Sequence, residues 1–297
     1  MNTVNDMTAS PVSTPTMNAV RPFYWSVRRE LWEYRSIYIA PLVVAAVAIL
    51  GFFVATIGRA MASSDLAQRR AILVEPYSFA TAIILFAAFI VSVFYSLDAL
   101  YGERRDRSIL FWKSLPVSDL TTVLAKTSVA LVVIPLVGFV ITAAAQLLMG
   151  LLSTAVLAGS GLSISELWGQ LIWVQVSLLY HLLTIHMLWY APLYAWLLLV
   201  SAWARRAPFL WAGLPALAIC GLEKIAFNTT HFLSLLHYRV RGPEEFHFPK
   251  AHASAMGSML HLEPGVFFGA PGLWIGLIVA ALFLAAAVRV RRYHGPI

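Results

Sequence analysis

Long apolar stretches dominate this sequence and constrain its fold more than any other feature. Hydrophobic residues make up 60% of the 297 residues, which is more than a soluble core of this size needs. Six stretches have the length and polarity of membrane helices. They lie near 37–58, 76–100, 119–150, 168–203, 208–238 and 271–290. The sequence therefore predicts an all-α membrane protein with six transmembrane helices.

The fourth and fifth stretches are less regular than the others. As one helix, 168–203 would be about 54 Å long, whereas the hydrocarbon core of a bilayer is about 30 Å thick. This stretch must tilt, project into water or break, and Pro192 is the expected kink. In the fifth stretch a polar triplet at 228–230 weakens the apolar run without ending it. That span therefore ends either near Phe227 or near Tyr238.

The residues before the first span fall into two parts. Residues 1–20 are rich in Ser, Thr, Asn and Pro and have no apolar core, which predicts a disordered tail. In 21–35 apolar side chains recur at helical spacing, and Arg21, Arg28 and Arg35 repeat every seven residues. This pattern predicts a helix on the membrane surface, with its arginines at lipid phosphates. The alternative is that 21–35 is the aqueous start of the first span.

Basic residues lie mainly on one side of the predicted spans. With the amino terminus inside, two-thirds of the 21 Lys and Arg residues fall in inner segments. Because basic residues mark cytoplasmic loops, we expect both termini to be cytoplasmic, in the inner membrane of a bacterium. This distribution also accounts for the net charge of +7, so we expect no nucleic-acid partner.

A short, charged and amphipathic segment separates the second span from the third. Ser108 is suited to cap a helix, apolar side chains follow from Ile109 to Leu115, and Pro116 ends the run. We expect a helix of about two turns, too short to form a domain but suited to insertion into a partner protein. The alternative is an ordinary basic cytoplasmic loop held by lipid phosphates.

This segment and the span pattern together resemble the ABC-2 type permease family, the membrane subunits of ATP-driven exporters. The motif resemblance covers about 98–126 and is clearest in the run Leu-Pro-Val-Ser at 115–118 and in the downstream Lys126. The topology is similar over about 21–290. The family often has a Gly-Thr pair where this chain has Arg and Ser at 107–108.

The resemblance implies that the chain is a permease subunit and not an enzyme. Residues 21–297 would form one transmembrane domain, with 239–270 on the outer side. The segment after span two would be a coupling helix, seated in a groove of a separate nucleotide-binding subunit. Its docking residues would be Glu103, Arg104, Arg105, Asp106, Arg107, Ser108, Phe111, Trp112, Lys113 and Pro116.

The same resemblance indicates which partners and cofactors to expect. The sequence contains no G-x-x-x-x-G-K-[ST] phosphate loop, so ATP and Mg²⁺ would be bound by the partner subunit and no cofactor by this chain. Six spans make half of the pathway in this family, so a second permease copy, identical or different, is expected. Membrane lipids complete the set of expected partners.

Several polar residues lie inside the predicted spans, where they are costly and often functional. Lys126 is about two turns into the third span, and Asp98, at the end of the second, is its expected ion-pair partner. Gln175, His181 and His186 lie in the fourth span, where they either line the pathway or bridge helices. The two histidines are five residues apart, or about 140° around an α-helix, so we expect them on different faces.

Histidines in the outer part of the chain suggest a metal site. Imidazole together with nearby Met or Glu side chains suits copper or zinc. The candidates are His231, His237, His247, His252 and His261. No two of them have i, i+4 spacing, and no H-E-x-x-H motif occurs, so we expect hydrogen-bonded interfacial histidines and no metal.

Two other functions fit the sequence less well. One is an ABC-type complex that does mechanical or maturation work on an extracytoplasmic partner through 239–270. The other is an intramembrane enzyme, which is disfavoured because no pair of catalytic residues within the spans has a recognisable spacing. The substrate class stays open among lipid, peptide, drug, sodium and polysaccharide.

Overall fold

The computed structural model of the chain describes residues 20–60, 66–115, 117–157, 164–241, 264–295 and 297. Every regular element in these ranges is a helix, so the prediction of an all-α protein is confirmed for this part of the chain. The expected disordered tail lies outside the described residues, apart from Val20.

Six of the described helical segments are long and apolar enough to cross a membrane. They are Ser36–Val54, Pro76–Arg105, Asp119–Ala155, Leu167–Trp189, Pro208–Phe227 and Pro271–Tyr293. Each of the six overlaps one predicted stretch, the fourth and fifth only in part, so the prediction of a multi-pass membrane protein is confirmed at this level. A shorter apolar helix, Ala191–Trp203, adds to them.

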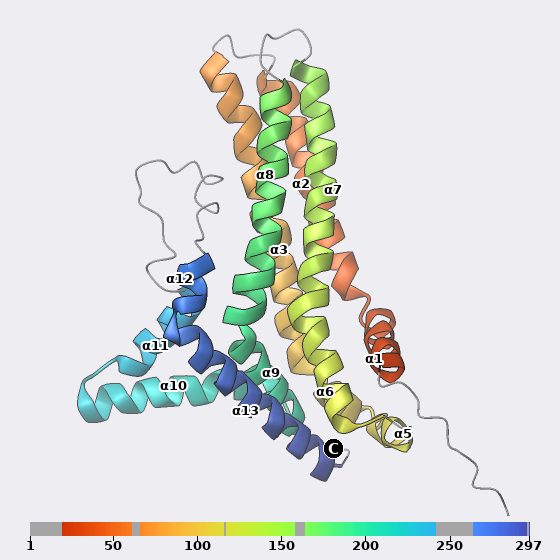
Figure 1. Ribbon diagram of the computed structural model, residues 1–297, viewed down its shortest axis with the longest axis vertical. Coiled ribbons are helices and arrows are strands. Elements are labelled where there is room, and N and C mark those ends of the chain that lie inside the picture. Colours follow the sequence, from red (N-terminus) through yellow and green to blue (C-terminus); the bar gives the residue numbers. More distant parts are fainter. Residues whose placement is uncertain (1–19, 61–65, 116, 158–163, 242–263, 296) are drawn as a thin grey trace, which may run out of the picture.

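Four long helices run side by side along the long axis of the molecule (Figure 1). They are α2 (Ser36–Ala60), α3 (Leu66–Asp98), α7 (Ile134–Leu157) and α8 (Ile164–His181). Helix α3 packs against α7 through small residues: a Cβ atom placed on Gly138 would lie only 2.8 Å from the Cβ atom of Ala88. Small residues at such contacts let helix backbones approach closely within a membrane.

Polar side chains also join these long helices. The Gln146 amide of α7 donates to the Thr81 hydroxyl of α3 at 2.5 Å, and Gln175 of α8 donates to Gln146 at 2.6 Å. Tyr77 and Ser153 share a hydrogen bond of 2.8 Å. Buried polar groups in a bilayer need such partners, so Gln175 bridges helices here.

The fourth apolar stretch is not one helix. After α8 the chain forms a π-helix, η2 (Leu182–Trp189), and then α9 (Ala191–Trp203). The expected break therefore occurs, and Pro192 lies in the first turn of α9, where its missing N–H costs no helical hydrogen bond. Only Leu167–Trp189 has the length of a span, while α9 packs along α13 (Pro271–Tyr293).

The fifth stretch takes the shorter of its two expected forms, ending at Phe227. Helix α10 (Pro208–Phe227) ends at Asn228, whose left-handed backbone (φ 52°) stops the helix, and α11 (His231–Arg241) follows. The Glu223 carboxylate caps α11, because it accepts the first two backbone N–H groups of that helix at 2.6 and 2.9 Å. The polar triplet thus ends the helix. Figure 1 shows α10 crossing the direction of the four long helices.

Helix α11 packs on the start of α13 through two glycines. A Cβ atom on Gly272 would lie 2.9 Å from the Tyr238 hydroxyl, and one on Gly276 would overlap the Arg239 guanidinium. Arg239 donates to the Gly272 carbonyl at 2.9 Å and lies over the Trp189 ring. Beside this contact lies α12 (Pro264–Gly269); most of the predicted outer segment, 242–263, is outside the described residues.

The contact between α3 and α7 gives a direct test of the packing. We expect Gly138→Ala to lower the free energy of unfolding by about 1–3 kcal/mol, because the new methyl group overlaps Ala88. Gly51→Ala on α2 is the matched control, since nothing lies within 4 Å of a Cβ atom there. SDS titration of the purified protein, followed by circular dichroism, measures both. Equal stabilities of the two variants would contradict this packing.

Candidate functional site

The charged interruption between the second and third spans forms two short helices. Helix α4 (Tyr101–Arg105) continues from the end of α3, and α5 (Ile109–Ser114) follows a turn at Arg107, whose φ is 58°. The expected cap at Ser108 is not formed: its hydroxyl lies 3.4 Å from the Glu103 carbonyl, and no side chain caps α5. A helix of the expected length is nevertheless present.

Lys126 lies in a buried cluster of charges beside these two helices. Its Nζ atom is 2.9 Å from the Glu30 carboxylate and 3.1 Å from the Glu103 carboxylate. The three side chains are exposed by 1%, 1% and 3%, respectively. A buried ammonium group in such a place needs a carboxylate partner, and here it has two.

The expected ion pair between Asp98 and Lys126 is replaced by these contacts. Asp98 lies nearer the surface, where it accepts a hydrogen bond from Tyr34 at 3.1 Å and lies 3.6 Å from Arg105. The reason is the position of Glu30, which comes from a helix that precedes the first span. Nothing in the local sequence around Lys126 indicates that neighbour.

Two arginines complete the cluster. Arg291 lies 2.5 Å from Glu103 and 3.1 Å from Asp119, while Arg29 lies 2.8 Å from Glu103 and also contacts Glu30. The second oxygen of the Glu30 carboxylate accepts the Tyr95 hydroxyl at 2.9 Å. The cluster therefore contains three cations and three buried or partly buried carboxylates, and a fourth, half-exposed carboxylate, Glu33, lies 3.6 Å from Arg29. Its charged members are Arg29, Glu30, Glu103, Asp119, Lys126 and Arg291.

The charge cluster ties together four elements that are far apart in the sequence. They are α1 (Val20–Glu33), α4, α6 (Asp119–Ser128) and α13. Burial acts to lower the pKa of Arg29, but the Glu30 and Glu103 carboxylates outweigh it and hold that pKa above its ordinary value. Arg29 therefore stays charged, and its ion pair with Glu103 joins α1 to α4.

The same cluster reaches helix α5 through an aromatic contact. The Arg29 guanidinium lies over the Trp112 ring, 3.9 Å from its centroid. One turn earlier on the same side of α5, Ile109 is fully buried, whereas Leu110 and Phe111 are both 59% exposed. One side of α5 is thus bound to the protein, and the other presents a leucine and a phenylalanine to the surroundings.

The expected docking residues divide into an inner and an outer group. Glu103 and Arg104 are buried, and Arg104 donates to the carbonyls of Ala202 and Ala204 at 2.6 and 3.1 Å. Trp112 and Ser108 are half-buried. Pro116 lies outside the described residues. The outer group consists of Arg105, Asp106, Arg107, Phe111 and Lys113.

Sequence reasoning missed the contributions of Arg29, Glu30 and Arg291. A signal for Glu30 was present, because it falls at helical spacing with Val27 and Leu31, whose side chains pack on the core. A carboxylate on an apolar face needs a buried cation. Arg291 carried no such signal, since an arginine at the end of a span is also an ordinary marker of orientation.

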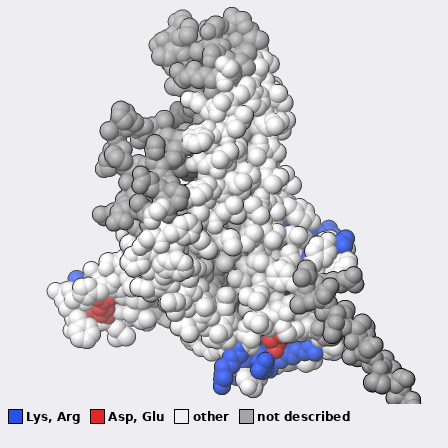
Figure 2. Space-filling view, viewed as in Figure 1, with Lys and Arg blue, Asp and Glu red and all other residues white. Residues whose placement is uncertain are grey.

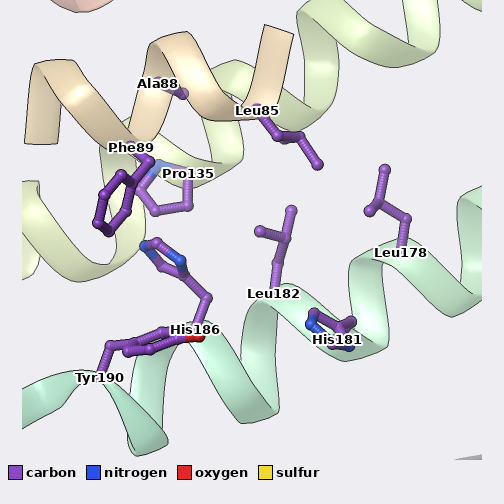
Figure 3. Close-up of a pocket in the computed structure, with 9 residues that line it drawn as sticks. All are labelled: Leu85, Ala88, Phe89, Pro135, Leu178, His181, Leu182, His186 and Tyr190. Carbon is purple, nitrogen blue, oxygen red and sulfur yellow. The ribbon is translucent and has the colours of Figure 1, made fainter. Parts of the chain in front are cut away.

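His181 and His186 line one cavity, contrary to the expectation that they lie on different faces. The π-helix η2 bonds residue i to residue i+5, which brings residues five apart onto neighbouring positions. The cavity has a volume of about 180 Å³. Figure 3 shows Leu182 between the two histidines and His186 directed toward Phe89 and Pro135.

The candidate metal ligands are not brought together within the described ranges, where no group of three or more His, Cys, Asp or Glu side chains could hold a metal ion. His231 and His237 are exposed on α11. The other three candidates, His247, His252 and His261, lie outside the described residues.

Comparisons with known proteins give no relative for this chain. No protein-family model matches it, and neither a curated protein nor a solved structure matches it. A functional proposal therefore depends on the residues and their geometry.

The charge cluster predicts a large effect for the loss of its central cation. We expect Lys126→Met to lower the free energy of unfolding by about 3–5 kcal/mol, because Glu30 and Glu103 would lose a buried partner. Adding Glu30→Gln should recover part of this loss, since it restores the charge balance. Lys224→Met, on the exposed surface of α10, is the matched control.

SDS unfolding of the unmodified chain, Lys126→Met, Glu30→Gln and the double variant would give the coupling between Lys126 and Glu30. If the double variant lost as much free energy of unfolding as the two single variants together, the two side chains would be energetically independent. That result would contradict the coupling proposed for the charge cluster.

Proposed function

We propose that the chain is the permease subunit of an ATP-driven ABC-2 type exporter and that α5 is its coupling helix, docked on a separate nucleotide-binding subunit. The observation that carries this proposal is the two-sided environment of α5. Ile109 is buried and Trp112 contacts the charge cluster through Arg29, while Leu110 and Phe111 remain exposed. A free loop would not need such anchoring.

The charge distribution supports docking at this end of the molecule. Figure 2 shows Lys and Arg side chains gathered at the lower end of the visible face, where α5 and the end of α13 lie in Figure 1. Exposed basic residues mark the cytoplasmic side of a membrane protein, which is where an ATPase would bind ATP and Mg²⁺. Phe111 would be the aromatic anchor in the groove of that partner.

Movement of α5 would be transmitted to the membrane-spanning helices through the charge cluster. Trp112 contacts Arg29, Arg29 contacts Glu103, and Glu103 contacts both Lys126 and Arg291. Helix α6 continues through the π-helix η1 (Val129–Val133) into α7, so the third span begins at the cluster. Closure of the ATPase would then move these helices as a rigid body, which is a common mode of switching.

Helix α1 has the features of an interfacial anchor. Trp25 and Trp32 are 57% and 67% exposed, and the Arg28 guanidinium lies 5.0 and 4.7 Å from their ring centroids. Tryptophan and arginine are suited to headgroup depth, where rings meet apolar chains and cations meet phosphates. We place α1 on the cytoplasmic surface, with a second permease copy completing the pathway.

The docking proposal is tested by removing the exposed ring of α5. We expect Phe111→Ser to weaken binding of the nucleotide-binding subunit by about 30-fold, as for an interface hot spot. Phe209→Ser is the matched control, because this ring, at the start of α10, is 61% exposed against 59% for Phe111. Binding is measured by biolayer interferometry with a nucleotide-binding subunit that co-purifies with this chain. Equal affinity of the two variants would reject docking through α5.

Transmission is tested separately from docking. We expect Arg29→Gln to retain the ATPase subunit but to abolish the change in ATP hydrolysis that the permease produces, because Trp112 loses its cation contact. Arg28→Gln is the control, since that neighbour contacts only Trp25 and Trp32 among the described rings. ATPase rates of the complexes in proteoliposomes give the comparison. If the permease still changed the rate of ATP hydrolysis in Arg29→Gln, transmission through Trp112 and Arg29 would be excluded.

A further inference from the structure

A cavity of about 180 Å³ lies between α3, the start of α7 and the broken fourth stretch. Apolar side chains make most of its wall, including Leu85, Leu178 and Leu182. Two aromatic rings, Phe89 and Tyr190, also line it. The cavity is partly open, since Phe89 is 37% exposed, and no member of the charge cluster or of α5 lines it, so neither of those sites explains it.

The π-helical segment η2 shapes this cavity. Segment η2 carries Leu182 and His186 on its wall, and η1 ends directly before α7, whose Pro135 forms the facing side. A π-turn adds a residue to a helical turn and occurs frequently at functional sites. Here it brings His181 and His186 onto one wall, which a continuous α-helix would not do.

The two histidines give an apolar cavity a polar side. His186 has a partner, because its Nε2 atom lies 3.3 Å from the Tyr194 hydroxyl. His181 has an Nδ1 atom that is buried and has no hydrogen-bond partner. A buried polar atom without a partner costs free energy, and a ligand that fills the cavity would supply that partner.

The size and chemistry of the cavity define the ligand. Apolar cavities of about 150 Å³ bind benzene, so this one has room for a single ring with a small substituent. A hydroxyl group both donates and accepts, and it therefore satisfies either tautomer of a neutral imidazole. No Asp, Glu, Lys or Arg lines the cavity, which disfavours a charged ligand.

We propose that this cavity binds a small uncharged lipophilic molecule with one hydroxyl group, of the phenol class, whose hydroxyl bonds to His181 and whose ring packs against Phe89 and Leu182. The site goes beyond the proposed function and does not depend on it. It belongs to the permease chain alone, so it is tested without a nucleotide-binding subunit.

The probe is 4-fluorophenol, titrated into the purified full chain in detergent and followed by ¹⁹F NMR. We expect saturable binding that Leu178→Trp weakens by at least about tenfold, because the larger ring fills the cavity. Val176→Trp, on the same helix at a position that is 56% exposed, is the matched control. This variant should bind 4-fluorophenol with the same affinity as the unmodified chain.

A second comparison isolates the hydrogen bond. We expect His181→Leu to lower the affinity for 4-fluorophenol by about fivefold, which corresponds to the loss of one hydrogen bond. The affinity for 4-fluorotoluene, which lacks the hydroxyl, should be the same in both proteins. Binding that never saturates, or that Leu178→Trp leaves unchanged, would show partition into detergent and overturn the site. If His181→Leu lowered the affinity for both probes equally, the assigned role of the imidazole would be overturned.

Discussion

The structure depends on one buried cation at the charged end of the helix bundle. Lys126 is 1% exposed and is held between Glu30 and Glu103. Because an isolated charge cannot be buried in an apolar environment without a large cost, these carboxylates fix where α1 and α4 lie relative to α6. Arg291 brings in α13 through the same Glu103 carboxylate. A few ionic contacts thus decide how segments from both ends of the chain assemble.

The charge cluster and the histidine cavity are connected along α3 and along the continuous run α6–η1–α7. On α3, Tyr95 donates to the cluster, Ser92 donates to the Ala130 carbonyl of η1 at 2.6 Å, and Phe89 lines the cavity. These residues follow one another at about one helical turn. On the facing side, the chain passes from Lys126 through η1 to the cavity wall at Pro135. A shift of α6 at the cluster would therefore also displace the wall of the cavity.

The sequence predicted the parts of the fold that local patterns control. The apolar stretches predicted six spans, and Pro192 predicted the break before α9. The helical spacing of Glu30 indicates a buried carboxylate, but its pairing with Lys126 could not be predicted, because the two residues are 96 positions apart and meet only through tertiary packing. The shared cavity of His181 and His186 depends on a π-helix, which apolar periodicity does not reveal.

The central claim is that the charge cluster holds α5 rigidly to α1. Double electron–electron resonance tests it most directly, with spin labels at Leu110 and Tyr24, both exposed, and with the single cysteine, Cys220, replaced by serine. The claim predicts one narrow distance distribution, which broadens in Glu103→Gln and stays narrow in Asp106→Asn, a change at an exposed carboxylate of the same segment. An equally narrow distribution in Glu103→Gln would contradict it.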